Sequence, residues 1–174
     1  MEPIQGEGGD HHFRPEFLQA MQALCHEHDA LFVLDEVPDN VFATSSRINS
    51  TWGGSLTDMV RSRRILEVVE SERLIDRAAD LGPVLLGLLT DLAGKHEQVT
   101  DVRGRGLMCA FSLPTAALRD ELLSSLREDE HVLLLGCGSR SVRFRPALTV
   151  SPEDLAAGVA ALDRVLTRLT EKSV

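Results

Sequence analysis

The sequence predicts an α/β protein built from two parts. In the first part, a helix that begins near Pro15 is followed by a strand of mainly apolar residues at 30–37. A helix followed by a strand buried on both faces is the repeating unit of α/β folds. Strand-like and helical segments also alternate along residues 97–174. We therefore expect a large domain with a long connecting helix over residues 1–96, and a small α/β domain over residues 97–174.

The helices of the first part are predicted from proline positions and apolar spacing. Pro15 suits the first helical position, and apolar residues at helical spacing continue to about Asp29. Residues 56–92 have a helical pattern with one apolar face. Pro83 lies inside that pattern and removes a backbone donor, so a kink or a split is expected there.

The second part contains several short apolar segments separated by turn signals. The segment GCGSR at 136–140 is expected to be a tight turn, because it lacks the third glycine and the following helix of a dinucleotide-binding loop. Ser151, Pro152 and Asp154 predict the start of the last helix through an N-cap and a capping box. Strands are expected at 99–102, 106–113, 131–135 and 141–146, and a helix at 115–129.

Composition excludes several classes of protein. The chain has 174 residues, 43% apolar and 26% charged, which is typical of globular domains. Its net charge of −9 argues against nucleic-acid binding, which needs a basic surface. No apolar run has the length of a membrane span, and no secretory signal is expected. Three widely spaced cysteines indicate free thiols. We expect a cytoplasmic protein that contacts neither nucleic acid nor membrane.

Histidine spacing does not predict a metal site. His11 and His12 are adjacent, and His26 and His28 lie two residues apart, whereas two zinc ligands on one helix usually lie four apart. No pattern of cysteine or carboxylate residues completes a ligand set. Surface histidines and no metal are therefore expected.

Three segments could contribute to a ligand site. Asp35 ends a buried strand, where it either is satisfied structurally or pairs with a cationic ligand group such as a protonated ring nitrogen. The segment STWGG at 50–54 offers hydroxyl groups to an anion but is also an ordinary loop sequence. Arg143 and Arg145 alternate with apolar residues on one strand and could bind a carboxylate. From the strand alone, a solvated edge strand is the favoured interpretation.

Five segments in a fixed order give a more specific prediction. They read EPIQGEGG, VLDEV, NSTWGG, VRGRGLM and VRFRPALTVS. This order resembles the class III, ornithine-transaminase-like aminotransferases of pyridoxal-phosphate fold type I, over nearly the whole chain. Within that family the sequence most resembles members that transfer the ε-amino group of L-lysine, which implies a role in lysine catabolism. The resemblance implies a partial fold of type I, made of a remnant of the large domain and the small C-terminal domain.

The resemblance implies contacts with pyridoxal 5'-phosphate. Asp35 would pair with the protonated pyridine nitrogen and keep the ring an electron sink. Thr51 would donate to the cofactor phosphate, in this family across the interface of a homodimer. Ser50, next to it, is assigned to the same cofactor-binding segment.

The resemblance also implies how the substrates bind. Arg143 would hold the α-carboxylate of L-lysine and, in the second half-reaction, 2-oxoglutarate. Glu7 resembles the family's gating glutamate, which shields or exposes a second arginine so that two unlike substrates share one site. Asn49 would line the substrate pocket.

The sequence departs from the family at the residue that forms the Schiff base. Val37 is followed directly by PDNVF, a segment that the family places beyond the catalytic lysine. The only lysines are Lys95 and Lys172, and neither is placed to replace it. The family's N-terminal half is missing as well. We therefore expect a doubly truncated aminotransferase with no catalytic residue, little or no activity, and weak or lost cofactor binding.

The same sequence is compatible with three alternatives. The chain could be one piece of a split aminotransferase whose companion supplies the lysine. It could be a non-catalytic interaction or dimerisation module. The opening on EPIQGEGG could also reflect the boundaries of the gene model.

Overall fold

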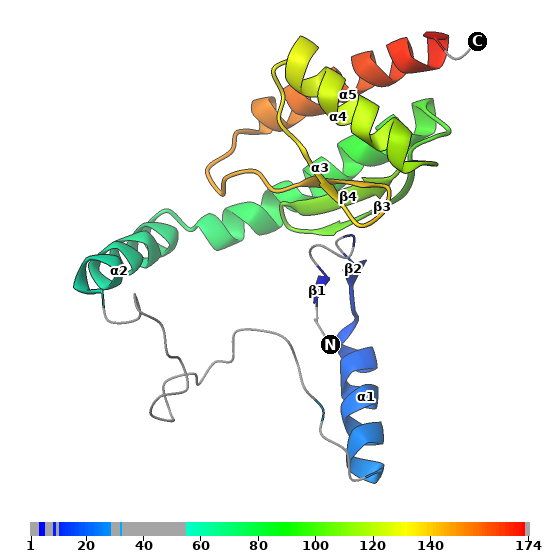
Figure 1. Cartoon of the computed structure of the whole chain (residues 1–174). Helices are drawn as coiled ribbons and strands as arrows, with labels where there is room; N and C mark the ends of the chain where they lie inside the picture. Colours follow the sequence, from blue (N-terminus) through cyan, green and yellow to red (C-terminus); the bar gives the residue numbers. More distant parts are fainter. Residues whose placement is uncertain (1–3, 6–8, 10, 29–31, 33–54, 173–174) are drawn as a thin grey trace. The chain divides into compact units, whose positions relative to one another are not determined.

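The computed structural model describes residues 4–5, 9, 11–28, 32 and 55–172. Contacts divide the chain into two compact units (Figure 1). The first unit contains Met1–Pro3 and Phe13–Leu74, and the second contains Ile4–His12 and Ile75–Val174. The domain boundary that we expect between residues 96 and 97 stays a prediction. The expected strand at 30–37 lies outside the described residues, apart from residue 32.

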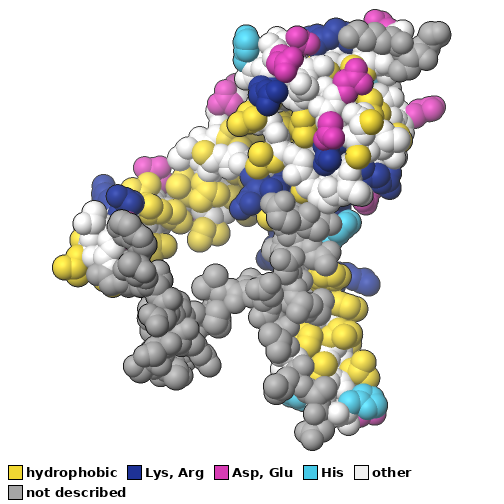
Figure 2. All heavy atoms as spheres, in the orientation of Figure 1, with side chains coloured by type: hydrophobic (Ala, Val, Ile, Leu, Met, Phe, Trp, Pro, Cys, Tyr) yellow, Lys and Arg dark blue, Asp and Glu magenta, His cyan; other side chains and the backbone are white. Residues whose placement is uncertain are grey.

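The described part of the first unit consists of two helices. Helix α1 (Pro15–Glu27) begins at the predicted proline and ends close to the predicted position. Helix α2 (Leu56–Ser71) begins after Ser55, whose Oγ accepts a hydrogen bond from the Asp58 amide. Neither helix buries a side chain, and Figure 2 shows apolar side chains on the visible surface of α1. The exposed large apolar residues of α2 are Leu56, Met59, Val60, Ile65 and Leu66.

The second unit is built on an antiparallel sheet with the strand order β3-β4-β6-β5. A short antiparallel hairpin, β1 with β2, precedes it in sequence. The strands are β1 (Ile4–Gln5), β2 (His11–His12), β3 (Thr100–Arg105), β4 (Met108–Ser112), β5 (Leu135–Cys137) and β6 (Ser141–Phe144).

The predicted strand at 131–135 is wrong for all but its last residue. His131 has a φ of 56°, and the Val132 amide bonds the Leu126 carbonyl, so this segment closes the preceding helix. Val132 and Leu134 still pack against the core, which explains their apolar character. The predicted turn at 136–140 is confirmed for residues 138–140, which join β5 to β6 and contain Gly138 with a φ of 54°, whereas Gly136 and Cys137 belong to β5.

Three helices accompany the sheet: α3 (Leu74–Lys95), α4 (Ala116–Asp129) and α5 (Pro152–Lys172). In Figure 1, α4 and α5 lie together on one side of it. The predicted start of α5 is confirmed, since the Asp154 amide donates to Ser151 Oγ over 3.0 Å. No helix of the described residues is long and apolar enough to cross a membrane.

The expected split at Pro83 is wrong. Helix α3 runs through Pro83 without interruption. The helical conformation is instead interrupted earlier, between α2 and α3, where Arg73 has a φ of 51°. Pro83 cannot donate to the carbonyl of Ala79, but both residues are exposed. Water can therefore replace the missing hydrogen bond at this position.

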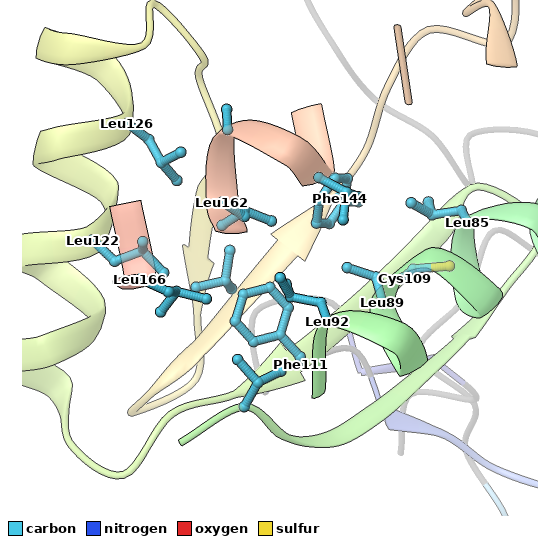
Figure 3. Packing of buried hydrophobic residues seen from close by; sticks show 14 of the residues in the cluster. Leu85, Leu89, Leu92, Cys109, Phe111, Leu122, Leu126, Phe144, Leu162 and Leu166 are labelled. Carbon is cyan, nitrogen blue, oxygen red and sulfur yellow. The ribbon is translucent and has the colours of Figure 1, made fainter. Parts of the chain in front are cut away.

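Leucine-rich helix faces and one face of the sheet form a continuous core. Figure 3 shows leucines of the three helices around Phe111 and Phe144. Phe111 and Val142 are completely buried. Because side chains alternate along a strand, Ala110, Ser112, Ser141 and Arg143 take the opposite face of the sheet. The core therefore fixes the backbone that carries Arg143.

Two glycines allow α3 to approach the turn between β3 and β4. A Cβ atom at Gly82 would lie 2.8 Å from the Cα atom of Gly106. Gly106 has a φ of 55°, a conformation that favours glycine. The second glycine of the RGRG sequence is therefore explained by close packing of backbone on backbone.

Candidate functional site

A row of paired residues crosses the sheet on the face opposite the core. Arg103 pairs with Ala110, Ala110 pairs with Arg143, and Arg143 pairs with Leu135. Directly opposite residues of antiparallel strands point to the same face. Two arginines thus share one face at the same level, separated by the small side chain of Ala110. With neighbouring strands about 4.8 Å apart, their Cα atoms are roughly 10 Å apart.

Arg143 lies on an interior strand. Strand β6 is placed between β4 and β5, so the edge-strand interpretation is wrong. The residue is 5% exposed and lines a pocket of about 230 Å³. Arg145 follows the strand, is exposed, and lines the same pocket. The other lining residues are Leu133, Leu134, Leu135, Phe144 and Pro146. Two cations and apolar walls form a suitable environment for a carboxylate on an aliphatic chain.

Arg143 is the one predicted site residue that the structure describes. The other predicted site residues, Glu7, Asp35, Asn49, Ser50 and Thr51, lie outside the described residues. Within the described ranges, no group of three or more His, Cys, Asp or Glu side chains could hold a metal ion. The expectations for these five residues and for metal binding stay predictions.

A polar network surrounds Arg103, and the sequence alone did not predict it. The Arg103 Nε atom donates to the Gly9 carbonyl over 3.0 Å, and Nη2 donates to the same oxygen. Nη1 donates to the carbonyl and carboxylate of Asp101 over 2.8 and 2.9 Å and to Ser112 Oγ over 3.2 Å. Nη2 also donates to Ser141 Oγ over 3.0 Å. The alternation of polar and apolar residues along β6, which reads SVRF, is the signal that could have indicated a polar face.

Lys95 does not fit covalent attachment of pyridoxal phosphate. Its Nζ atom lies 2.7 Å from Asp163 Oδ2, and this hydrogen bond is the largest cause of a raised Lys95 pKa. Schiff-base formation needs the neutral amine, which a raised pKa disfavours. Lys95 lines a separate groove of about 640 Å³ between α3 and α5, which Arg143 does not line. Lys172 is the last residue of α5. Lys95, the one lysine whose side chain the structure describes, is therefore not suited to the cofactor.

Asp163 joins α3 to α5 through Lys95 and His96, and replacing it with asparagine should remove the carboxylate that makes this link sensitive to acid. His96 Nε2 lies 2.6 Å from Asp163 Oδ1. The hydrogen bonds from Lys95 and then His96 lower the Asp163 pKa below its ordinary 3.8. The carboxylate therefore stabilises the folded state above about pH 4, and this stability is lost as the pH falls through the lowered pKa.

We expect Asp163→Asn to lower the free energy of unfolding by about 1 kcal/mol at pH 7, because the pair is partly exposed. Urea unfolding should show a larger loss at pH 7 than at pH 2.5, because protonation of the Asp163 carboxylate weakens the same hydrogen bonds in the wild-type chain. Asp80→Asn, a change at an exposed residue of α3, serves as the control. An equal loss for Asp163→Asn at both pH values would contradict the assignment.

Comparison with known proteins gives a family. A model of the family "Aminotransferase class-III" matches the chain in two segments, residues 1–39 and 38–166. The segments meet at the junction of VLDEV with PDNVF, where the sequence departs from the expected order. The match is therefore interrupted at the place where the resemblance predicts that the lysine block is missing.

Two curated relatives cover almost the whole chain. The L-lysine-epsilon aminotransferase of Mycobacterium tuberculosis (strain ATCC 25618 / H37Rv) is 46% identical over 213 residues, covering 97% of this chain and 47% of the relative. The same enzyme of Streptomyces clavuligerus is 43% identical, covering 98% of this chain and 47% of the relative. The first alignment is longer than the 174 residues of this chain, so that relative has internal residues with no counterpart here.

The structure supports the same relationship. A solved structure of lysine aminotransferase from M. tuberculosis in the internal aldimine form matches with a TM-score of 0.85 and 46% identity. The match covers 97% of this chain and 48% of that one. The chain thus spans about half the length of the relatives it matches, and the predicted fold class is confirmed as part of the fold of these enzymes. The chain belongs to the class III aminotransferase family.

Proposed function

We propose that this chain is a part of an L-lysine ε-aminotransferase that retains the substrate-carboxylate arginine but has no Schiff-base lysine, and that these 174 residues do not transfer amino groups by themselves. The observation that carries the proposal is the number and the placement of the lysines. The chain has two, Lys95 is held by Asp163, and the match to the family is interrupted where the missing lysine block would lie. The names of the relatives support L-lysine as the amino donor.

Arg143 is proposed to bind the α-carboxylate of L-lysine and the carboxylate of 2-oxoglutarate. Its burial in the pocket with Phe144 and Pro146 supports this assignment, since a guanidinium binds a carboxylate more strongly where water is displaced. Glu7 and Asn49 are proposed to complete the substrate site. These assignments extend the family resemblance to residues of this chain.

Asp35, Thr51 and Ser50 are proposed to contact pyridoxal 5'-phosphate without a covalent bond. The cofactor, when bound, supplies an electron-withdrawing ring. Without a lysine there is no covalent anchor and no amine to move the proton during transamination. We therefore expect weak binding of the cofactor and no turnover.

A second candidate function is a non-catalytic interaction or dimerisation module, or one piece of a split aminotransferase. The exposed apolar side chains of α2 favour it, with Leu56 77% and Val60 70% exposed. A globular protein rarely leaves such a helix face uncovered. A companion chain that restores transamination would support the split enzyme.

Reduction with borohydride in the presence of pyridoxal phosphate tests the proposed function. A covalent adduct forms wherever a lysine makes a Schiff base, and mass spectrometry locates it. We expect no stoichiometric adduct, only low labelling shared by Lys95 and Lys172. The M. tuberculosis lysine aminotransferase, solved in its internal aldimine form, is the positive control.

The variant Lys95→Arg separates specific from random labelling. If labelling is random, this variant loses only the Lys95 share. A stoichiometric adduct at Lys95 that disappears in Lys95→Arg would overturn the proposed function, and so would a stoichiometric adduct at Lys172.

A further inference from the structure

We propose that Arg103 is a positioning residue for the carboxylate site. Its guanidinium holds the hairpin of β1 and β2 (residues 4–12), through the carbonyl of Gly9, on the sheet face that carries Arg143. The proposal rests on the proposed function for the identity of the ligand, but the fixing of the segment can be tested without any ligand. Both Gly9 and Arg103 belong to the second unit.

Every nitrogen of the Arg103 guanidinium group takes part in a hydrogen bond. All three nitrogens donate, and their acceptors are the Gly9 carbonyl, Asp101, Ser112 and Ser141. The side chain is 14% exposed, and the Asp101 carboxylate 2.9 Å away balances its charge. Charge-assisted bonds in such a partly buried place are stronger than neutral ones. Arg103 therefore acts as a fixed bridge rather than as a mobile surface cation.

Gly9 is suited to receive this bridge. It is buried and has a φ of 118°, a backbone conformation that residues other than glycine rarely adopt. A Cβ atom there would lie 3.0 Å from His11 Nε2 and 3.5 Å from Arg103 Nη2. The glycine thus lets the arginine reach the backbone carbonyl.

The other end of the bridge reaches the strand of Arg143. Ser141 lies two residues before Arg143 on β6, and its side chain shares the same face. Ser141 Oγ lies 3.1 Å from Ser112 Oγ, so Arg103 binds a linked pair of hydroxyl groups on β4 and β6. One side chain thereby connects the segment before α1 with three neighbouring strands. A single ammonium group cannot occupy both the Gly9 and Ser141 positions, so lysine should not replace arginine here.

Hydrogen exchange of the full chain, read by mass spectrometry, tests the fixing of the segment. We expect Arg103→Lys to speed exchange within residues 4–12 by about tenfold or more, because the charge remains but the bridging geometry is lost. Exchange in α5 serves as the internal reference for global stability. Arg105→Lys is the matched control, since Arg105 lies on the same strand and face but is exposed.

A second readout tests the positioning of the carboxylate site. The dissociation constant for 2-oxoglutarate, measured by calorimetry, should rise several-fold in Arg103→Lys and stay unchanged in Arg105→Lys. A purely structural contact would change the exchange rates without changing this constant, which would overturn the positioning role. If the exchange rates respond as expected but wild-type protein binds no 2-oxoglutarate, Arg103 does hold residues 4–12 in place, and the ligand of the proposed function is wrong.

Gly9→Ala perturbs the same contact from the other side. It should also speed exchange within residues 4–12 while leaving α5 unchanged, even if Arg103→Lys fails to fold. The proposal is overturned if residues 4–12 of the wild-type chain exchange as fast as an unstructured peptide. Unchanged exchange of that segment in both Arg103→Lys and Gly9→Ala would also overturn it.

Discussion

Replacing Phe111 with alanine is expected to lower the free energy of unfolding of the second unit by about 3–5 kcal/mol. Phe111 is completely buried on β4, with leucines of the helices around it (Figure 3). Removing the ring leaves a cavity that the closely packed neighbours cannot fill without strain. This is the largest stability effect that we expect from a single substitution in the described residues.

The effect can be measured by hydrogen exchange in β6 and α5 as a function of urea concentration. Phe17→Ala is the control, because Phe17 is 42% exposed on α1, where its ring stacks on that of Phe13 with 5.3 Å between the ring centroids. It should cost at most about 1.5 kcal/mol and leave exchange in the second unit unchanged. Equal losses for the two variants would contradict the placement of Phe111 in the core.

The core bears directly on the candidate site. Val142 and Phe144 point into the core on either side of Arg143 along β6. Their packing sets the position of the backbone that carries Arg143. A variant that loosens the core should therefore also weaken binding in the pocket that Arg143 lines.

Elements with strong local signals could be predicted from the sequence. The start of α1 at Pro15, the start of α5 after Ser151, and the turn that contains Gly138 are all confirmed. Each depends on a few neighbouring residues with a specific backbone preference. The structure adds the distances and moves the start of the turn from residue 136 to residue 138.

Features that depend on distant residues could not be predicted in this way. Whether β6 is an edge or an interior strand depends on β4 and β5, and a single strand sequence contains no information about its neighbours. The strand expected at 131–135 failed because apolar residues that close a helix over the core look like a strand. Pro83 is tolerated because its side of α3 is exposed.

The network of Arg103 is the clearest case. Its partner Gly9 is 94 residues away in the sequence, and Ser141 is 38 residues away. The RGRG segment served only as a mark of family resemblance, and the role of its first arginine needs the fold. By contrast, the alternation along its strand makes Arg143 a candidate and the resemblance predicts its role, and the structure adds its burial and its pocket.

Arg143→Gln is expected to weaken binding of 2-oxoglutarate by about 100-fold, the largest functional effect of any substitution in the described residues. The glutamine retains a hydrogen-bond donor but has neither the charge nor the paired geometry of a guanidinium. Arg105→Gln removes a cation from the same sheet face at an exposed position, and it should leave the affinity unchanged. Circular dichroism of each variant checks that the fold is retained.

The dissociation constant of 2-oxoglutarate for the wild-type chain and for Arg143→Gln is the measurement that tests most directly whether this chain retains the substrate site of its family. Calorimetry at pH 7 should detect weak binding to the wild-type chain and to Arg105→Gln, and none to Arg143→Gln. Equal affinities for the wild-type chain and a folded Arg143→Gln would show that the pocket on β6 does not bind the substrate carboxylate.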